Sequence, residues 1–158
     1  LALAALVLGA LFFLMLWLGQ RLAGPLSAAE RNAFVLTLLP ISLAYHFSHY
    51  LPVLLVNAQY GLKALGDPFA TGANWLGLAG LHVTTSFFAD FQTVETIWIA
   101  QSGAIVLGHV WAVGLAHGVA IRHYGDRRRA ALMHAPLAAG MVGYTVFGLW
   151  LLSAPTGV

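Results

Sequence analysis

Four long apolar stretches dominate the pattern of hydrophobic and polar positions along the chain. No Asp, Glu, Lys or Arg occurs from Leu1 to Gln20, from Asn32 to Leu62, from Thr96 to Ile121 or from Ala130 to Val158. An α-helix rises about 1.5 Å per residue, so about 20 apolar residues cross the roughly 30 Å hydrocarbon core of a bilayer. The pattern therefore predicts about four transmembrane helices, at about 2–18, 33–57, 95–121 and 131–153.

Composition supports an all-α integral membrane protein with one transmembrane domain over residues 1–158. The chain is 60% hydrophobic and 8% charged, whereas about a quarter of the residues in a soluble domain are charged. The formal net charge of +2 comes from arginines in the connections and does not indicate a nucleic-acid surface. The sequence begins with Leu1 rather than Met, so we expect part of the N-terminus to be missing.

The charged residues predict the orientation of the helices. Connections 19–32 and 122–129 lie on one side of a four-helix arrangement and carry Arg21, Arg31, Arg122, Arg127, Arg128 and Arg129. The long connection 58–94 has Lys63 as its single Lys or Arg, contains Asp67 and Asp90, and is rich in aromatic residues. Because cytoplasmic connections carry an excess of Lys and Arg, 19–32 and 122–129 are predicted to be cytoplasmic and 58–94 extracytoplasmic.

Two features inside the spans bear on helix packing. Pro52 has no N–H, so the carbonyl of Ser48 loses its helical partner and the helix is expected to bend. Small residues four apart, such as Gly114/Gly118 and Ala112/Ala116, let helices approach closely. The third span is therefore expected to be central in the bundle.

Seven histidines are unusual in so apolar a chain, and an ionisable residue at membrane depth is a functional hypothesis. From the helix rise, His46 and His49 lie roughly 20 and 24 Å from the cytoplasmic end of their span. His109 lies roughly 18 Å and His117 about 6 Å from that side on the next span. His46, His49 and His109 thus share one level near the outer leaflet and are predicted to form a metal or cofactor site.

Neutral imidazole suits copper, zinc or iron, and histidines on two helices can also ligate haem. Polar groups near the outer end are candidates to orient the ligands by hydrogen bonds: Tyr45, Gln59, Asp67 and Gln101. His117 is too far along its helix to join this metal site and is predicted to be separate or structural. His82, His123 and His134 are interpreted as solvated loop or interface residues.

The plainer interpretation gives the histidines a structural role. They would then hydrogen-bond across the bundle to Tyr45, Ser48, Tyr50, Ser102 or Tyr144. Such bonds contribute about 0.6 to 2 kcal/mol each in membranes. Residue types alone leave both interpretations open.

Several segments carry a family resemblance. SLAYHFSHYLPVLLVNAQ, GDPFATGANWLG, GHVWAVGLAH and MVGYTVFGLW, within residues 36–154, resemble a group of polytopic bacterial membrane proteins often named fenitrothion hydrolase. The resemblance implies a bacterial inner-membrane protein and a phosphotriester hydrolase activity, in which a histidine-bound metal would activate water. It assigns no catalytic residue.

Three functions therefore remain open. The first is a membrane protein with a histidine-rich metal or cofactor site at His46, His49 and His109. The second is an accessory, non-catalytic subunit of a larger membrane complex, which would bind other membrane subunits as well as lipid. The third is a membrane-bound, metal-dependent hydrolase of the phosphotriester type, so whether the protein is an enzyme stays open.

Overall fold

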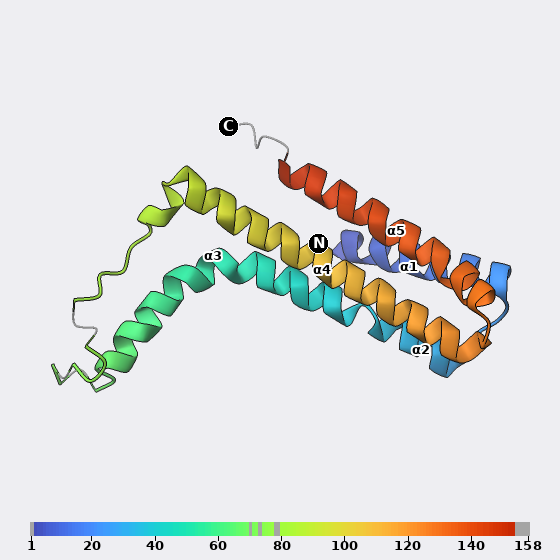
Figure 1. The fold of residues 1–158 in the computed structure, drawn as a ribbon, viewed down its shortest axis with the longest axis horizontal. Helices are drawn as coiled ribbons and strands as arrows, with labels where there is room; N and C mark the ends of the chain where they lie inside the picture. The colour runs from blue at the N-terminus through green and yellow to red at the C-terminus, as the bar shows by residue number, and fades with distance from the viewer. Residues whose placement is uncertain (1, 70, 73, 78–79, 154–158) are drawn as a thin grey trace. The chain divides into compact units, whose positions relative to one another are not determined.

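The computed structural model describes residues 2–69, 71–72, 74–77 and 80–153, and these form helices joined by loops, with no strand among them. Figure 1 shows α1 (Ala2–Ala23), α2 (Ala28–Leu36), α3 (Leu39–Gly66), α4 (Phe91–Tyr124) and α5 (Arg127–Ser153), with a short 3-10 helix, η1 (Ser86–Phe88). Four segments are long and apolar enough to span a membrane: Leu6–Ala23, Ala28–Gly66, Phe91–Tyr124 and Arg127–Trp150. The prediction of an all-α protein with four such helices is confirmed.

The helices extend beyond the predicted spans, and the connections are correspondingly shorter. The capping box of Ser27 and Glu30 explains the early start of α2: Ser27 Oγ accepts the Glu30 N–H at 3.3 Å, and the Glu30 carboxylate accepts the Ser27 N–H at 2.6 Å. Between α4 and α5 only two residues intervene. Gly125 has a positive φ of 63° and ends α4, and Asp126 accepts the N–H groups of Arg128 and Arg129 at the start of α5.

The second predicted span is divided near its start. Pro40 has no N–H for the carbonyl of Leu36, and its ring would clash with that carbonyl in a continuous helix. The chain responds with a tighter turn, in which the N–H groups of Thr37 and Leu38 donate to Phe34 and Val35 carbonyls at 3.1 Å. The Thr37 hydroxyl also donates to the Phe34 carbonyl at 2.6 Å. α2 therefore ends at Leu36, and α3 begins at Leu39.

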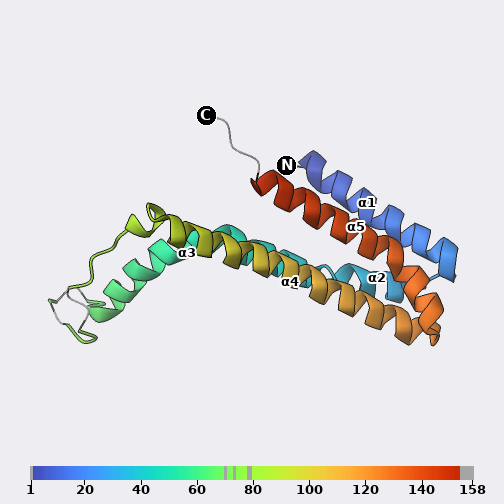
Figure 2. The ribbon, with the colours of Figure 1, turned by 45° about the horizontal axis from the view of Figure 1, so that its top comes forward.

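The chain divides into two compact units, which we describe separately: the first unit takes in residues 1–44 and 105–158, and the second unit residues 45–104. In the first unit α1 lies along α5, as Figures 1 and 2 both show. Close packing of these helices depends on glycine. A Cβ on Gly19 would overlap the backbone oxygen of Met133, and one on Gly140 would overlap the side chain of Met15.

The core of the first unit gathers side chains from α1, α2, α4, α5 and the connection between α1 and α2. Its buried members are Leu16, Leu26, Phe34, Ala116, Val119, Ala120, Ala130, Met133 and Leu137. On α4 the buried small residues recur every four positions, at Gly108, Ala112, Ala116 and Ala120. A Cβ on Gly108 would come within 2.5 Å of the Ala44 Cβ, which confirms that small residues allow close approach here. The Gly114/Gly118 pair lies outside this stripe: no described atom is within 4 Å of a Cβ built on either glycine.

The second unit contains α3 from Tyr45, the connection to α4 with η1, and α4 up to Ala104. The side chain of Gln59 pairs with the backbone of Thr84, with its Nε2 donating to the Thr84 carbonyl at 3.0 Å and its Oε1 accepting the Thr84 N–H at 2.9 Å. Asp67 and Asp90 mark the two ends of this connection. The long predicted loop is therefore a connection fixed to α3 by side-chain hydrogen bonds.

Candidate functional site

His46 and His49 lie one turn apart on α3 within an aromatic group. Both side chains are exposed. His49 is stacked on Tyr45, with ring centroids 5.9 Å apart and an interplanar angle of 11°, and meets Tyr50 edge-on at 5.0 Å. The His46 ring lies 5.9 Å from that of Tyr50. The spacing of three residues places both imidazoles on neighbouring positions of one helix face, as the sequence predicts.

His109, in the first unit, is buried at 8% exposure, and its tautomer follows from its hydrogen bond. Its Nδ1 lies 2.8 Å from the carbonyl oxygen of Ile105, one turn earlier on α4. Since a carbonyl only accepts, Nδ1 carries the proton, and in the neutral ring Nε2 keeps its lone pair. Metal-ligating histidines have this arrangement, in which one ring N–H is held by a backbone carbonyl and the other nitrogen is the ligand. The Tyr144 ring is 6.3 Å away.

The three-histidine site remains a prediction. His46 and His49 belong to the second unit and His109 to the first. Within the part of the chain that the structure describes, no group of three or more His, Asp or Glu side chains is placed to hold one metal ion.

Gln101 has a partner that follows from the proline in α3. Its Nε2 donates to the Ser48 carbonyl at 2.7 Å, and the Ser48 hydroxyl donates to the Gln101 carbonyl at 2.9 Å. Pro52 is the residue whose missing N–H leaves that Ser48 carbonyl without its helical donor. Gln101 therefore satisfies a backbone acceptor and joins α3 to α4 in the second unit.

Asp67 also serves the connection after α3. Its carboxylate accepts the N–H of Thr71 at 2.9 Å and that of Gly72 at 2.7 Å. These hydrogen bonds hold the pKa of the Asp67 carboxyl below its ordinary value. The bond from the Thr71 backbone contributes most. His82 lies exposed in the same connection. Gln59 and Asp67 thus have structural partners, and their predicted role beside a metal remains a prediction.

A second pair of histidines meets inside the first unit. His117 on α4 and His134 on α5 approach to 3.4 Å between their Nδ1 atoms, with ring centroids 4.8 Å apart, and both side chains are half-buried. The sequence contained a signal for this pair. His117 precedes the end of its predicted span by four residues and His134 follows the start of the next by three, so antiparallel helices place them at about the same depth.

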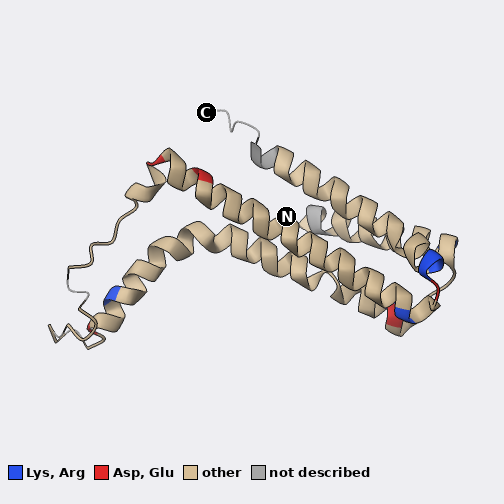
Figure 3. Cartoon of the chain, viewed as in Figure 1, with Lys and Arg blue, Asp and Glu red and all other residues tan. Residues whose placement is uncertain are grey.

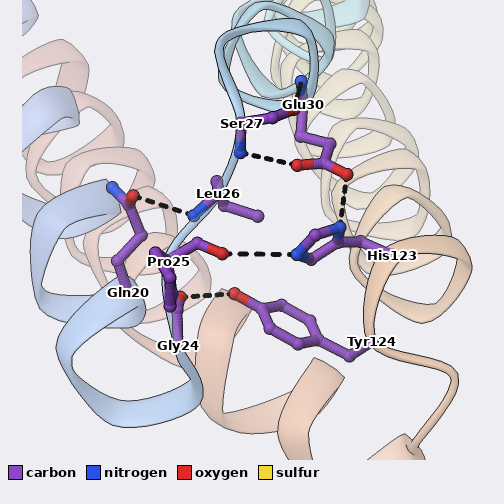
Figure 4. Close-up of polar contacts among 8 residues, drawn as sticks. All are labelled: Gln20, Gly24, Pro25, Leu26, Ser27, Glu30, His123 and Tyr124. Carbon is purple, nitrogen blue, oxygen red and sulfur yellow. Dashed lines mark hydrogen bonds and ion pairs between the residues drawn. The ribbon is translucent and has the colours of Figure 1, made fainter.

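The connection between α1 and α2 is held against the end of α4, as Figure 4 shows. The Tyr124 hydroxyl donates to the Gly24 carbonyl at 2.6 Å, and His123 Nε2 lies 3.3 Å from the Pro25 carbonyl oxygen. His123 Nδ1 forms an ion pair with the Glu30 carboxylate. His123 is therefore a packing residue between two connections rather than a solvated loop residue. The contacts also place the two arginine-bearing connections at the same end of the first unit, where Figure 3 shows basic residues.

Comparisons with known proteins do not assign the chain to a family. No family model, no curated protein and no solved structure matches the chain. The resemblance to proteins named fenitrothion hydrolase thus stays a prediction, and the fold and the histidines carry the functional argument.

Proposed function

We propose that this chain is an integral membrane protein with a transition-metal or haem site, of which His109 is the buried ligand and His46 and His49 are the partner ligands. The observation that carries the proposal is the hydrogen bond from His109 Nδ1–H to the Ile105 carbonyl. It fixes the tautomer and leaves a nitrogen lone pair on a buried ring. Neutral imidazoles in that state suit copper, zinc or iron.

Orientation in the membrane is part of the same proposal. The connections that carry six arginines lie at one end of the first unit, tied together by His123 and Tyr124. The positive-inside rule assigns that end to the cytoplasm of a bacterial inner membrane. The connection 67–90 is then extracytoplasmic, and the proposed site lies in the outer half of the bilayer.

Elemental analysis of the purified protein tests the metal site. We expect near-stoichiometric copper, zinc or iron, or a haem absorption band, in the wild-type protein. His46→Ala, His49→Ala and His109→Ala should each lower the content, whereas His82→Ala, which alters an exposed histidine in the connection, should not. Equal metal or haem content in the wild-type protein and all four variants would contradict the proposal. So would a folded wild-type sample that contains no metal and no haem.

A second candidate function, a subunit of a larger membrane complex, is favoured by the exposed side chains of α3. Tyr45 and Tyr50 are 58% and 55% exposed, and His46 and His49 between them are exposed too. Polar side chains at membrane depth normally face protein rather than lipid, because burying them in hydrocarbon is costly. A partner helix covering this face would remove that cost.

Site-specific cross-linking distinguishes this second candidate. A photoreactive residue at Tyr45 should capture a membrane protein in native membranes, and the same residue at Leu14 of α1, which is also exposed, should capture much less. A stoichiometric partner that co-purifies in mild detergent would identify the complex. Cross-links only to lipid from Tyr45 would argue against it.

A further inference from the structure

His117 and His134 form a histidine pair beside the core of the first unit. The pair bridges α4 and α5 with 3.4 Å between the two Nδ1 atoms. Each histidine is flanked by core residues of the first unit: Ala116 and Ala120 around His117, and Met133 and Leu137 around His134 are at most 2% exposed. Both histidines are themselves half-buried, so the pair lies at the edge of this core, where small side-chain rotations remain possible.

The chemistry of the pair follows from its proton count. A hydrogen bond between two neutral imidazoles at this distance uses one Nδ1–H and one Nδ1 lone pair. If the bridging proton moves to Nε2 of its own ring, both Nδ1 lone pairs face the same point. A cation at that point would then have two nitrogen ligands, and the site would lose no proton overall.

We propose that His117 and His134 bind one soft monovalent metal ion, of the Cu(I) and Ag(I) class, between their Nδ1 atoms. This site is distinct from the proposed site at His109. A divalent zinc ion ordinarily requires four ligands, and in the described part of the chain no third His, Asp or Glu joins the pair. A monovalent d¹⁰ ion is stable with two ligands, and imidazole is a suitable ligand for copper.

Charge and distance both fit a monovalent ion. The cost of placing an ion in an apolar medium rises with the square of its charge, so a single charge is far less costly than a double one. Metal–imidazole nitrogen distances are about 2.0 Å, so a linear two-ligand site needs about 4 Å between nitrogens. The observed 3.4 Å requires the rings to separate by a fraction of an ångström, which small side-chain rotations supply.

Silver binding tests the proposal with a probe that does not change oxidation state. The chain has no cysteine, so no thiolate competes for the ion. Titration of the detergent-purified full chain should show a site that His117→Ala and His134→Ala each weaken by at least about tenfold. His82→Ala should leave that site unchanged. His109→Ala should also leave it unchanged, so failure here is distinguishable from failure of the proposed His109 site.

Two further measurements keep the result decisive if an alanine variant does not fold. In the wild-type protein, silver should shift the side-chain ¹⁵N signals of His117 and His134. The double variant His117→Met with His134→Met should still bind silver, because thioethers are soft ligands, although it cannot form the imidazole hydrogen bond. Unshifted histidine signals at saturating silver, or binding that survives both alanine variants, would overturn the proposal and leave the pair a structural hydrogen bond.

Discussion

At the scale of single residues, the second unit shows how a proline leaves a backbone carbonyl without a donor and how a side chain of another helix replaces that donor. Pro52 removes the donor for the Ser48 carbonyl, and Gln101 supplies a replacement from α4 at 2.7 Å. In a bilayer core no water is available to do so, which makes a side-chain donor necessary. The bond gives the amide side chain of Gln101 a backbone partner within α3.

Gln101→Leu is expected to destabilise the protein by about 1–2 kcal/mol, because the Ser48 carbonyl loses its donor. Unfolding in detergent, followed by circular dichroism, measures the loss. Gln92→Leu is the matched control, an exposed glutamine in the first turn of the same helix. In a Pro52→Ala background the helix regains its own N–H donor, so Gln101→Leu should cost less there. An equal cost in both backgrounds would contradict this account.

Tyr124→Phe is expected to cost about 1 kcal/mol of stability, because the hydroxyl that holds the Gly24 carbonyl at 2.6 Å is lost while the ring is kept. Gly24 has a positive φ of 121°, a conformation that this contact helps to fix. The same unfolding assay measures the change. Tyr60→Phe, on an exposed tyrosine of α3, serves as the control and should lie close to wild type.

Some of these residue contacts were readable from the sequence and others were not. Pro52 identified the Ser48 carbonyl as unpaired, because proline chemistry is local. The donor was not predictable, since it lies far along the chain. Ser27 and Glu30 did contain a readable signal, the serine and glutamate three residues apart that form a capping box. The depth arithmetic that grouped His109 with His46 would equally have grouped His117 with His134.

At the scale of helices, α1 and α5 show that glycine position decides how closely two helices pack. Gly19 faces a backbone oxygen of Met133, which cannot move alone, whereas Gly140 faces the flexible end of Met15. No described atom lies within 4 Å of a Cβ built on Gly9, on the same helix as Gly19. The sequence marks all three positions as glycine and does not distinguish them, because the distinction depends on the partner helix.

Three alanine substitutions should therefore differ in a fixed order. Gly19→Ala should cost about 1–3 kcal/mol through overpacking, Gly140→Ala less, and Gly9→Ala nothing, since alanine favours the helix. Chemical unfolding in detergent ranks the three variants. A Gly9→Ala cost equal to that of Gly19→Ala would show that the interface between α1 and α5 does not depend on close backbone approach.

The start of α4 should loosen in acid. The hydroxyl and N–H of Thr93 donate to the Asp90 carboxylate, the hydroxyl bond contributing most, and lower the pKa of that carboxyl. A lowered folded-state pKa stabilises the folded form above the ordinary value of about 4, and this contribution is lost as pH falls through and below that value. Amide exchange over residues 91–94, corrected for intrinsic rates, should therefore accelerate below about pH 4.

Asp90→Asn is the control for that pH dependence. Asparagine keeps an oxygen that accepts the Thr93 N–H but carries no titratable charge. Its exchange over residues 91–94 should be nearly independent of pH in the same range. If the wild-type protein shows no acceleration in acid, the carboxylate contacts at Asp90 do not stabilise this helix end.

At the scale of the whole molecule, apolar length correctly predicted four segments long and apolar enough to span a membrane, because the thickness of a bilayer sets a minimum helix length. The bonds of His123 and Tyr124 hold the connection between α1 and α2 against the end of α4, and the side of the membrane that the two arginine-bearing connections face stays a prediction. The break at Thr37–Leu38 was not predicted, since the second span was treated as one bent helix. The predicted three-histidine site divides between the two units, and helix rise alone fixes depth but not which helix faces meet.

Cysteine labelling in intact cells tests the proposed orientation, because the chain has no native cysteine. Ala29→Cys and Arg127→Cys, both exposed at the connections of the first unit, should resist a membrane-impermeant maleimide until the cells are opened. Thr85→Cys, exposed in the connection after α3, should react in intact cells. The reverse pattern would invert the topology and place the proposed metal site in the inner leaflet.

The two-residue connection Gly125–Asp126 has a consequence for how the protein is made. Arg127, Arg128 and Arg129 follow it at once and Arg122 precedes it closely, and moving each arginine through the bilayer centre costs about 2.5 kcal/mol or more. The connection is too short to let α4 and α5 separate. The two helices therefore cannot insert into the membrane one after the other as independent segments. We therefore expect α4 and α5 to insert together as one helical hairpin. The connection with Arg127, Arg128 and Arg129 would stay on the cytoplasmic side, where the ribosome is.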